Sequence, residues 1–142
     1  MEIFEVAPED PRLADVYPVM HELRTEMSLD DFRATYEAGY PTGYRVAALF
    51  DEGECRAAAG YHLTYGFLHG RFLYIDDLVT ASDHRSKSYG RALDDYLVEL
   101  ARAEGCSGVQ LDSGTQRTDA HRFYFREGYV ITSFHFVRRF ST

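Results

Sequence analysis

The chain has 142 residues, a formal net charge of −8 and an apolar fraction of 45%, with eleven tyrosines and ten phenylalanines. This length suits one domain with a single core, and the composition excludes a disordered or fibrous protein. The acidic balance gives no reason to expect nucleic acid as a partner, because an acidic surface repels phosphate backbones.

The sequence shows no sign of a segment that directs the chain to a membrane. The first ten residues, MEIFEVAPED, are acidic where a signal peptide requires positive charge. No stretch approaches the roughly 18 apolar residues of a membrane span. Cys55 and Cys106 do not form a CxxC pair, and we interpret them as reduced thiols, although the sequence does not exclude a disulfide between them. We therefore expect a single cytoplasmic domain over residues 1–142 with no membrane contact.

The first part of the chain predicts a short strand and two helices. Ile3–Val6 is the predicted strand. Apolar residues at three- and four-residue spacing predict one face of a helix: Leu13, Val16, Tyr17, Met20 and Leu23. Pro18 lies inside this pattern and is expected to kink or split the helix. Ser28, with Asp31 three residues later, resembles a capping box and predicts a second helix through about Ala38.

The middle of the chain has the pattern of three consecutive strands. Tyr44–Phe50 and Arg56–Tyr65 predict an antiparallel hairpin around an acidic turn at residues 51–54. A second turn at His69-Gly70 leads into the third strand, Phe72–Thr80. These elements predict an antiparallel part of a sheet.

The last part of the chain alternates helices and strands. After a polar loop at residues 81–88, one apolar face predicts a helix that ends before Gly105: Leu93, Tyr96, Leu97 and Leu100. A strand, a helix closed by Gly128 and a long final strand are predicted in turn: Val109–Leu111, Thr118–Glu127 and Tyr129–Phe140. The order β-α-α-β-β-β-α-β-α-β predicts an α/β fold with a central mixed sheet and helices on both faces.

The polar loop places basic side chains at the start of a helix. Arg85, Lys87 and Arg91 lie where the first helical N–H groups have no partner within the helix and the dipole leaves partial positive charge. A bound anion would take several backbone hydrogen bonds there, together with charge-assisted contacts. Without an anion, basic residues at this end oppose the dipole. This favours an anion site over a solvated helix start.

The run Arg85-Ser86-Lys87-Ser88-Tyr89-Gly90 resembles the Arg/Gln-x-x-Gly-x-Gly/Ala motif of the GNAT superfamily of N-acetyltransferases. In that family the motif binds the pyrophosphate of acetyl-CoA. Arg85 matches its first position and Gly90 its last, whereas Ser88 and Ser86 stand where the family usually has glycine. The resemblance implies a GNAT-like fold with acetyl-CoA as co-substrate. It assigns Arg85, Ser86, Lys87, Ser88, Tyr89, Gly90 and Arg91 to the cofactor.

The same resemblance assigns a role to the end of the preceding strand. Leu78, Val79 and Thr80 fall where GNAT proteins have a bulge that separates their fourth strand from its neighbour. The backbone groups exposed there hydrogen-bond the pantetheine arm and the thioester carbonyl, which stabilises charge that develops during transfer. The residue types alone are equally compatible with an ordinary buried strand.

The segment from Arg117 to Tyr129 resembles a later GNAT motif, a helix that ends in an aromatic residue, Tyr and then Gly before the last strand. Tyr124 takes the Tyr position and Gly128 the Gly position. The resemblance implies that Tyr124 protonates the departing CoA sulfur, and the reference pKa values of a phenol, ~10, and a thiol, ~8.5, roughly match. Packing of Tyr124 in the core is the alternative.

Two adjacent carboxylates, Asp76 and Asp77, interrupt an apolar strand, and neighbouring residues of a strand are expected to point to opposite faces. Carboxylates there are costly unless they are paired, hydrated or near a site. By resemblance to polyamine-type GNAT enzymes, Asp76 is the candidate base, which deprotonates the amine through water. Asp77, Asp112 and His121 are candidate substrate-binding residues. For the carboxylates Asp76, Asp77 and Asp112, the alternative is an ion pair with a nearby arginine.

The other polar residues do not predict a metal site or a covalent intermediate. None of the six histidines has the two-His helical spacing of a metal site, and His21, His62, His69 and His84 are interpreted as structural. His121 and His135 are kept as pocket candidates. Neither a Ser nucleophile elbow nor a Walker loop occurs, which favours direct transfer over an acyl-enzyme.

The string Ala-His-Arg-Phe-Tyr at residues 120–124 resembles the branch that contains aminoalkylphosphonate N-acetyltransferases. It implies a small primary amine as acceptor, with Arg122, Arg126 or Arg138 available to hold an anionic group. Two alternatives stay open, namely transfer to a protein N-terminus or lysine, and a CoA-binding sensing module without catalysis. Homodimers are common in such families, so we expect a homodimer.

Overall fold

The computed structural model describes residues 1–83 and 88–141. The described chain divides into two compact units, Met1–Leu111 and a second one that begins at Asp112. Arg85, Ser86 and Lys87 of the predicted pyrophosphate loop lie outside the described residues. The single domain over residues 1–142 stays a prediction.

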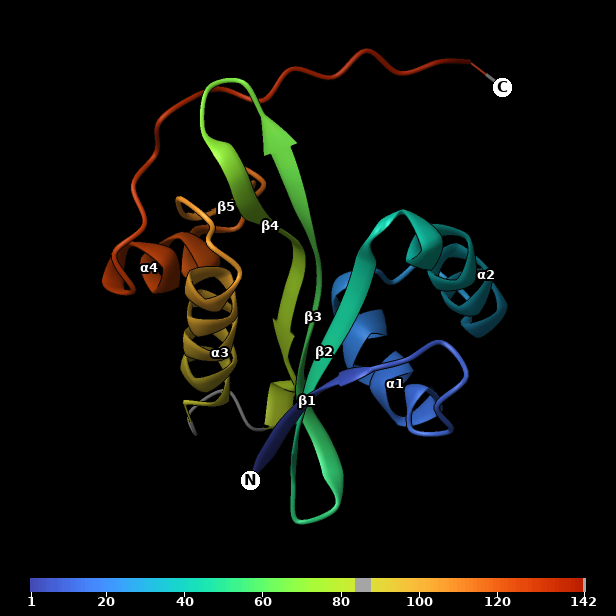
Figure 1. Cartoon of the computed structure of the whole chain (residues 1–142). Coiled ribbons are helices and arrows are strands. Elements are labelled where there is room, and N and C mark those ends of the chain that lie inside the picture. The colour runs from blue at the N-terminus through green and yellow to red at the C-terminus, as the bar shows by residue number, and fades with distance from the viewer. Residues whose placement is uncertain (84–87, 142) are drawn as a thin grey trace. The chain divides into compact units, whose positions relative to one another are not determined.

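The first unit is built on a five-stranded sheet in the order β1-β2-β3-β4-β5 (Figure 1). The strands are β1 (Glu2–Val6), β2 (Tyr44–Asp51), β3 (Glu54–Gly66), β4 (Gly70–Thr80) and β5 (Val109–Leu111). The first four pair antiparallel with their neighbours, and β5 pairs parallel with β4. This arrangement confirms the predicted mixed sheet.

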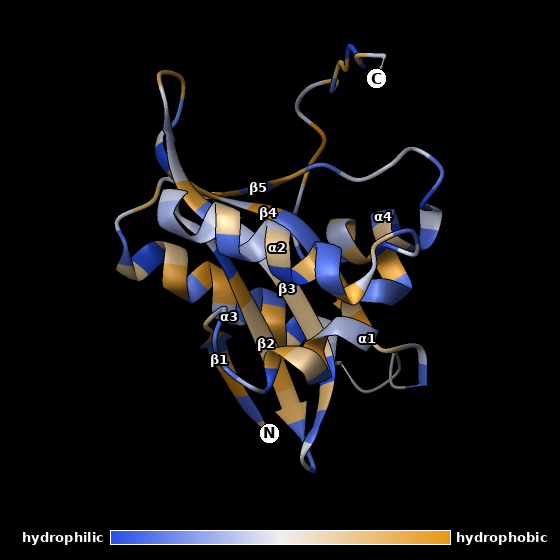
Figure 2. Ribbon diagram, turned by 90° about the vertical axis from the view of Figure 1, so that its right-hand side faces the viewer, coloured by the Kyte–Doolittle hydropathy of each residue, from blue (hydrophilic) through white to orange (hydrophobic). Residues whose placement is uncertain are grey.

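Helices cover both faces of this sheet (Figure 1). Helices α1 (Leu13–Leu23) and α2 (Leu29–Gly39) lie on one face, followed by a short 3-10 helix at Tyr40–Thr42, and α3 (Tyr89–Ala103) lies on the other. The apolar stripe of α3 is buried at Leu93 and Leu97. The strands β2 and β3 between these layers are largely hydrophobic (Figure 2). Burial of apolar area on both faces stabilises the fold.

Several local signals act as predicted. Ser28 and Asp31 form the capping box, with the Asp31 N–H donating to Ser28 Oγ over 3.0 Å. Gly105 follows α3 at a φ of 73°, where a side chain would be strained. The expected split at Pro18 is wrong, because α1 continues through this residue. A proline lacks one N–H, which costs this helix a single hydrogen bond in its middle turn without ending it.

The second unit contains helix α4 (Thr118–Arg126), which Gly128 closes with a φ of 94°. The predicted strand Tyr129–Phe140 is not formed, since residues 129–141 have no regular secondary structure. Its large apolar side chains are exposed: Val130, Ile131, Phe134, Phe136, Val137 and Phe140. A strand requires a neighbour that takes up its backbone hydrogen bonds, and no strand of the described ranges pairs with this segment.

Two further features concern cysteines and membranes. Cys55 and Cys106 are both free thiols. Burial raises the pKa of Cys55 to about 12, so this thiol is a poor nucleophile at neutral pH. Within residues 1–83 and 88–141, every helix is too short or too polar to cross a lipid bilayer.

Candidate active site

The pairing of β3 with β4 is interrupted in the middle of the sheet. It is regular as far as Tyr61 and Ile75, but Gly60 then pairs with Asp77, so that Asp76 is an extra residue in β4. This is a β-bulge. On its other edge, β4 pairs with β5 no further than Ile75. Beyond the bulge, one edge of β4 therefore carries backbone groups that no strand of the described chain takes up. The bulge lies at Asp76, before the residues Leu78, Val79 and Thr80 at which the resemblance implied one.

The bulge places both carboxylates on one face of the sheet. Asp76 Oδ2 lies 2.8 Å from His62 Nδ1, and Asp77 Oδ2 accepts a hydrogen bond of 3.2 Å from the Tyr44 hydroxyl. Tyr44 and His62 are cross-strand partners whose stacked rings lie 6.5 Å apart, so they share a face. The prediction that Asp76 and Asp77 point to opposite faces is wrong, because the extra residue of the bulge interrupts the alternation of the strand.

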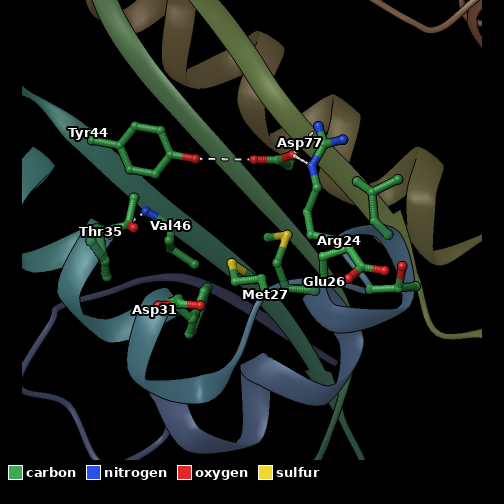
Figure 3. Close-up of a pocket in the computed structure, with 13 residues that line it drawn as sticks. Arg24, Glu26, Met27, Asp31, Thr35, Tyr44, Val46 and Asp77 are labelled. Carbon is green, nitrogen blue, oxygen red and sulfur yellow. Dashed lines mark hydrogen bonds and ion pairs between the residues drawn. The ribbon is translucent and has the colours of Figure 1, made fainter. Parts of the chain in front are cut away.

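Arg24, the residue after α1, connects the α1–α2 loop to this carboxylate pair. Its Nε donates to Asp77 Oδ1 over 2.6 Å and its Nη2 to the Asp76 carbonyl oxygen over 3.3 Å. Figure 3 shows Asp77 between the Arg24 guanidinium and the Tyr44 hydroxyl. Burial, followed by the negative charge of Asp77, raises the pKa of Tyr44, so its hydroxyl stays protonated and donates. Asp77 is thus neutralised by a cation, which leaves Asp76 as the carboxylate suited to proton transfer.

The environment of Asp76 suits a proton acceptor. Its side chain is 30% exposed, so a ligand or water can reach it. Burial raises the pKa of Asp76, while the hydrogen bond from His62 acts in the opposite direction without outweighing it. A base is most effective when its pKa approaches the working pH, and this shift acts in that direction.

A cavity of about 640 Å³ opens on the same face, between α1, α2, their connecting loop and the strands β2 and β4 (Figure 3). Apolar side chains from the helical side include Met20, Leu23, Met27 and Phe32. The Arg24–Asp77 pair and the Tyr44 hydroxyl lie at its strand side, together with the Tyr44 ring. This size and this combination of apolar walls with a few polar groups are typical of a small-molecule site.

The start of α3 has the geometry of an anion site. The first hydrogen bond within the helix runs from the Ala92 N–H to the Ser88 oxygen, so the N–H groups of residues 89–91 precede it. The Tyr89 hydroxyl donates to Asp51 over 2.6 Å, which holds the helix start against the end of β2. Gly90 and the exposed Arg91 complete the first turn.

The assigned end of β4 can contact a ligand chiefly through its backbone. The side chains of Leu78 and Val79 are 9% and 8% exposed and belong to the core, and Thr80 is half-buried. Backbone hydrogen bonding is the role that the resemblance implied for these three residues.

Ser88 adopts a left-handed conformation, with a φ of 62° and a ψ of 22°. This conformation strains any residue with a Cβ, which explains why the family motif has glycine here. We expect Ser88→Gly to raise the free energy of unfolding by about 0.5–1 kcal/mol and to leave acetyl-CoA binding at least as tight. Thermal melting and calorimetric titration measure the two quantities.

Glu52 provides the matched control, because it too has a positive φ, 53°, but lies in the β2–β3 turn. Glu52→Gly should give a similar gain in stability and an unchanged dissociation constant. Weaker acetyl-CoA binding by Ser88→Gly alone would contradict the prediction and show that the serine hydroxyl contributes to binding.

The remaining predicted site residues belong to the second unit. The Tyr124 ring lies in the last turn of α4, with edge-on contacts to Phe123 and Tyr129 at centroid distances of 5.4 and 5.7 Å. His121 Nε2 lies 2.7 Å from the Gly114 carbonyl oxygen. Asp112 pairs with His135 over 3.4 Å. Asp76 and Asp77 are the predicted site residues that the first unit brings together.

Sequence reasoning missed three residues of this site. Arg24 and Tyr44 were not singled out, and His62 was interpreted as structural. Counting back from the His69-Gly70 turn pairs His62 with Tyr74, as the structure has it. The contact of His62 with Asp76 could not be counted in this way, because it depends on the bulge.

The sequence matches the Acetyltransferase (GNAT) family over residues 7–129. The chain belongs to the GNAT family of acetyltransferases. This match confirms the family inferred from the two motifs, and with it an acyltransferase that depends on acetyl-CoA, the donor that the family uses.

Relatives of this acetyltransferase agree with the assignment. It is 41% identical over 125 residues to the uncharacterized N-acetyltransferase YhdJ of Bacillus subtilis, covering 87% of this chain and 88% of that protein. It is 30% identical over 128 residues to the aminoalkylphosphonate N-acetyltransferase of Salmonella typhimurium, covering 87% and 82%. A solved aminoglycoside N-acetyltransferase in complex with CoA superposes with a TM-score of 0.86 at 12% identity, covering 99% of this chain and 95% of that one. This last likeness confirms the fold.

Proposed function

We propose that this acetyltransferase moves the acetyl group of acetyl-CoA directly to the nitrogen of a small primary amine. The bulge at Asp76 carries the proposal, because it puts a carboxylate with a raised pKa on the face that holds the cavity. The cavity has the size for a small acceptor, and the name of the Salmonella typhimurium relative also supports a small amine.

The residues present fit acetyl-CoA at two places. The edge of β4 beyond Ile75 offers backbone groups of Leu78, Val79 and Thr80 to a pantetheine arm. The start of α3, with Ser88 and Gly90, offers N–H groups to a pyrophosphate. Bound acetyl-CoA supplies the activated acetyl group.

In the proposed mechanism, the chain's own groups orient the acceptor and move two protons. The proton of the amine leaves toward the Asp76 carboxylate, and the Tyr124 hydroxyl protonates the departing sulfur. Asp77, held by Arg24 and Tyr44, shapes the wall of the acceptor site. The acid role of Tyr124 rests on the family resemblance, as do the candidate roles of Asp112 and His121 in contact with the acceptor.

Thermal melting with acetyl-CoA tests the cofactor site. A ligand at 100 times its dissociation constant adds ~2.7 kcal/mol of stability, so saturating acetyl-CoA should raise the melting temperature by several degrees. Acetate at the same concentration is the matched control and should leave the melting temperature unchanged. An unchanged melting temperature with acetyl-CoA would contradict the proposal.

Release of CoA from acetyl-CoA tests turnover and the acceptor class. The panel comprises spermidine, 2-aminoethylphosphonate, kanamycin and a peptide with a free N-terminus. Release with one of the first three supports the proposed small amine. Release with the peptide alone would favour the protein-acetyltransferase alternative, and binding without release from any amine would favour a sensing module.

Four further expectations stay predictions of the sequence. They are a cytoplasmic location, a homodimer, a single domain and the absence of nucleic-acid and membrane partners. Light scattering on the purified chain measures the mass in solution and tests the homodimer.

A further inference from the structure

His62 and Asp76 are joined by a hydrogen bond between their side chains. The distance from His62 Nδ1 to Asp76 Oδ2 is 2.8 Å. An ionised carboxylate only accepts hydrogen bonds, so Nδ1 carries the hydrogen and Nε2, on the opposite side of the ring, has the lone pair. Among the residues that the structure describes, none hydrogen-bonds to Nε2. The ring therefore has one nitrogen fixed by Asp76 and the other available.

Neighbouring groups hold the imidazole in place without enclosing it. Its ring stacks on Tyr44, on β2, at 6.5 Å and lies 5.5 Å from the ring of Tyr74, on β4. The His62 side chain is still 33% exposed. The charged groups next to this cluster are Asp76 and, through Tyr44, the Asp77–Arg24 pair.

The imidazole of His62 lies between the residues that line the cavity and the bulge of β4. Tyr44 and Asp77 line the cavity, and they are the cross-strand and sequence neighbours of His62 and Asp76 respectively. The bulge is also where β4 loses its pairing with β5. His62 and Asp76 do not line the cavity themselves, but they lie directly beside Tyr44 and Asp77, which do. An amine that extends past these two side chains would meet the imidazole.

We propose that the proton of the acceptor amine passes to His62, so that Asp76 acts through this histidine as its positioning residue instead of accepting the proton directly. This deepens the proposed function and rests on it. The amine nitrogen forms a bond to the acetyl carbon and its excess proton passes to His62 Nε2. The bond from carbon to sulfur breaks, and the thiolate takes a proton from Tyr124. The imidazolium, paired with the Asp76 carboxylate, then releases its proton to solvent, and Tyr124 regains one from solvent.

An imidazole is better suited to this step than the carboxylate alone. Its reference pKa of ~6.5 lies near the working pH, whereas that of an aspartate is ~3.9. A carboxylate that fixes the tautomer and stabilises the imidazolium is the arrangement found in acid–base pairs of other enzymes.

The test is the pH profile of kcat/KM for His62→Gln and Asp76→Asn, measured with the fastest amine of the panel. Removal of a general base lowers rates by about 10²–10⁴-fold. We expect such a loss for His62→Gln, together with loss of the acid limb of the profile. Asp76→Asn should lose less activity but displace the limb, while the KM for acetyl-CoA stays within about twofold of the original in both.

Two further measurements separate catalysis from folding. His62→Ala should regain activity when free imidazole is added, and a merely structural histidine would not respond to it. His69→Gln, in the β3–β4 turn, is the matched control and should keep the original profile. The proposal would be overturned if both substitutions left kcat/KM and the acid limb of its pH profile unchanged. It would also be overturned if imidazole failed to restore activity to a folded His62→Ala. Absence of CoA release by the unaltered chain with every amine would instead reject the proposed function itself.

Discussion

Replacing Tyr124 by Phe is expected to lower acetyl transfer by more than about tenfold while leaving acetyl-CoA binding unchanged. The substitution removes one hydroxyl and keeps the ring, whose edge-on contacts with Phe123 and Tyr129 stabilise the end of α4. If the hydroxyl protonates the departing sulfur, phenylalanine leaves the thiolate without its acid. The loss should appear in kcat, because the proton is needed in the transition state rather than for binding.

Steady-state CoA release measures the rate, and calorimetric titration measures acetyl-CoA binding. Tyr129→Phe is the matched control, since it makes the same chemical change beside the same ring and should keep turnover within about twofold. Turnover of Tyr124→Phe equal to that of the unaltered chain would reject the acid role and leave Tyr124 as a packing residue.

The second large effect is expected at Gly60, the glycine opposite the bulge. A Cβ at this position would overlap the Tyr44 hydroxyl oxygen and would lie 3.1 Å from Tyr44 Cζ and 3.2 Å from Asp77 Oδ2. Gly60→Ala should therefore displace Tyr44 from Asp77. We expect a loss of about 1–3 kcal/mol in the free energy of unfolding, as for other overpacked sites, with reduced turnover.

A double-mutant cycle isolates this contact. In a Tyr44→Phe background the overlapping oxygen is gone, so Gly60→Ala should cost less there, with a coupling energy of at least about 0.5 kcal/mol. Gly108→Ala is the control, because its Cβ would meet no atom within 4 Å and its stability should change by no more than about 0.5 kcal/mol. Equal costs in both backgrounds would show that the displaced group is not the Tyr44 hydroxyl. Urea unfolding measures the free energy of unfolding of the unaltered chain, the two single variants and the double variant.

Local patterns in the sequence predicted the fold well. The Ser28–Asp31 capping box and the turn at His69-Gly70 depend on interactions between residues close in the chain, and the structure has both. The parallel pairing of β5 with β4 follows from the helix that connects them. Such features can be recognised without knowing the tertiary structure.

The site was predicted less completely, because it depends on one irregularity. The alternation of a regular strand sent Asp76 and Asp77 to opposite faces. The resemblance implied a bulge at residues 78–80, but no feature of the sequence placed the extra residue at Asp76. His62 and Arg24 join the site from 14 and 53 residues away in the chain, through contacts with Asp76 and Asp77. Spacing in the sequence does not report contacts over such separations.

The predicted strand at Tyr129–Phe140 was wrong for a different reason. Its aromatic and β-branched residues have high strand propensity, but this propensity describes how well a side chain fits a sheet surface rather than the backbone alone. Without a paired neighbour the propensity has no effect, and the sequence of the segment does not reveal whether one is present.

Through Arg24, the cavity that we propose for the acceptor depends on ionic strength. The α1–α2 loop is tied to β4 by the ion pair of Arg24 with Asp77, whose side chains are 53% and 14% exposed. Dissolved salt screens a charge pair in proportion to its contact with water, over a Debye length of about 8 Å at physiological ionic strength. The cavity wall is therefore held more firmly in dilute buffer than in concentrated salt, and measurements of acceptor affinity are comparable only at a fixed salt concentration.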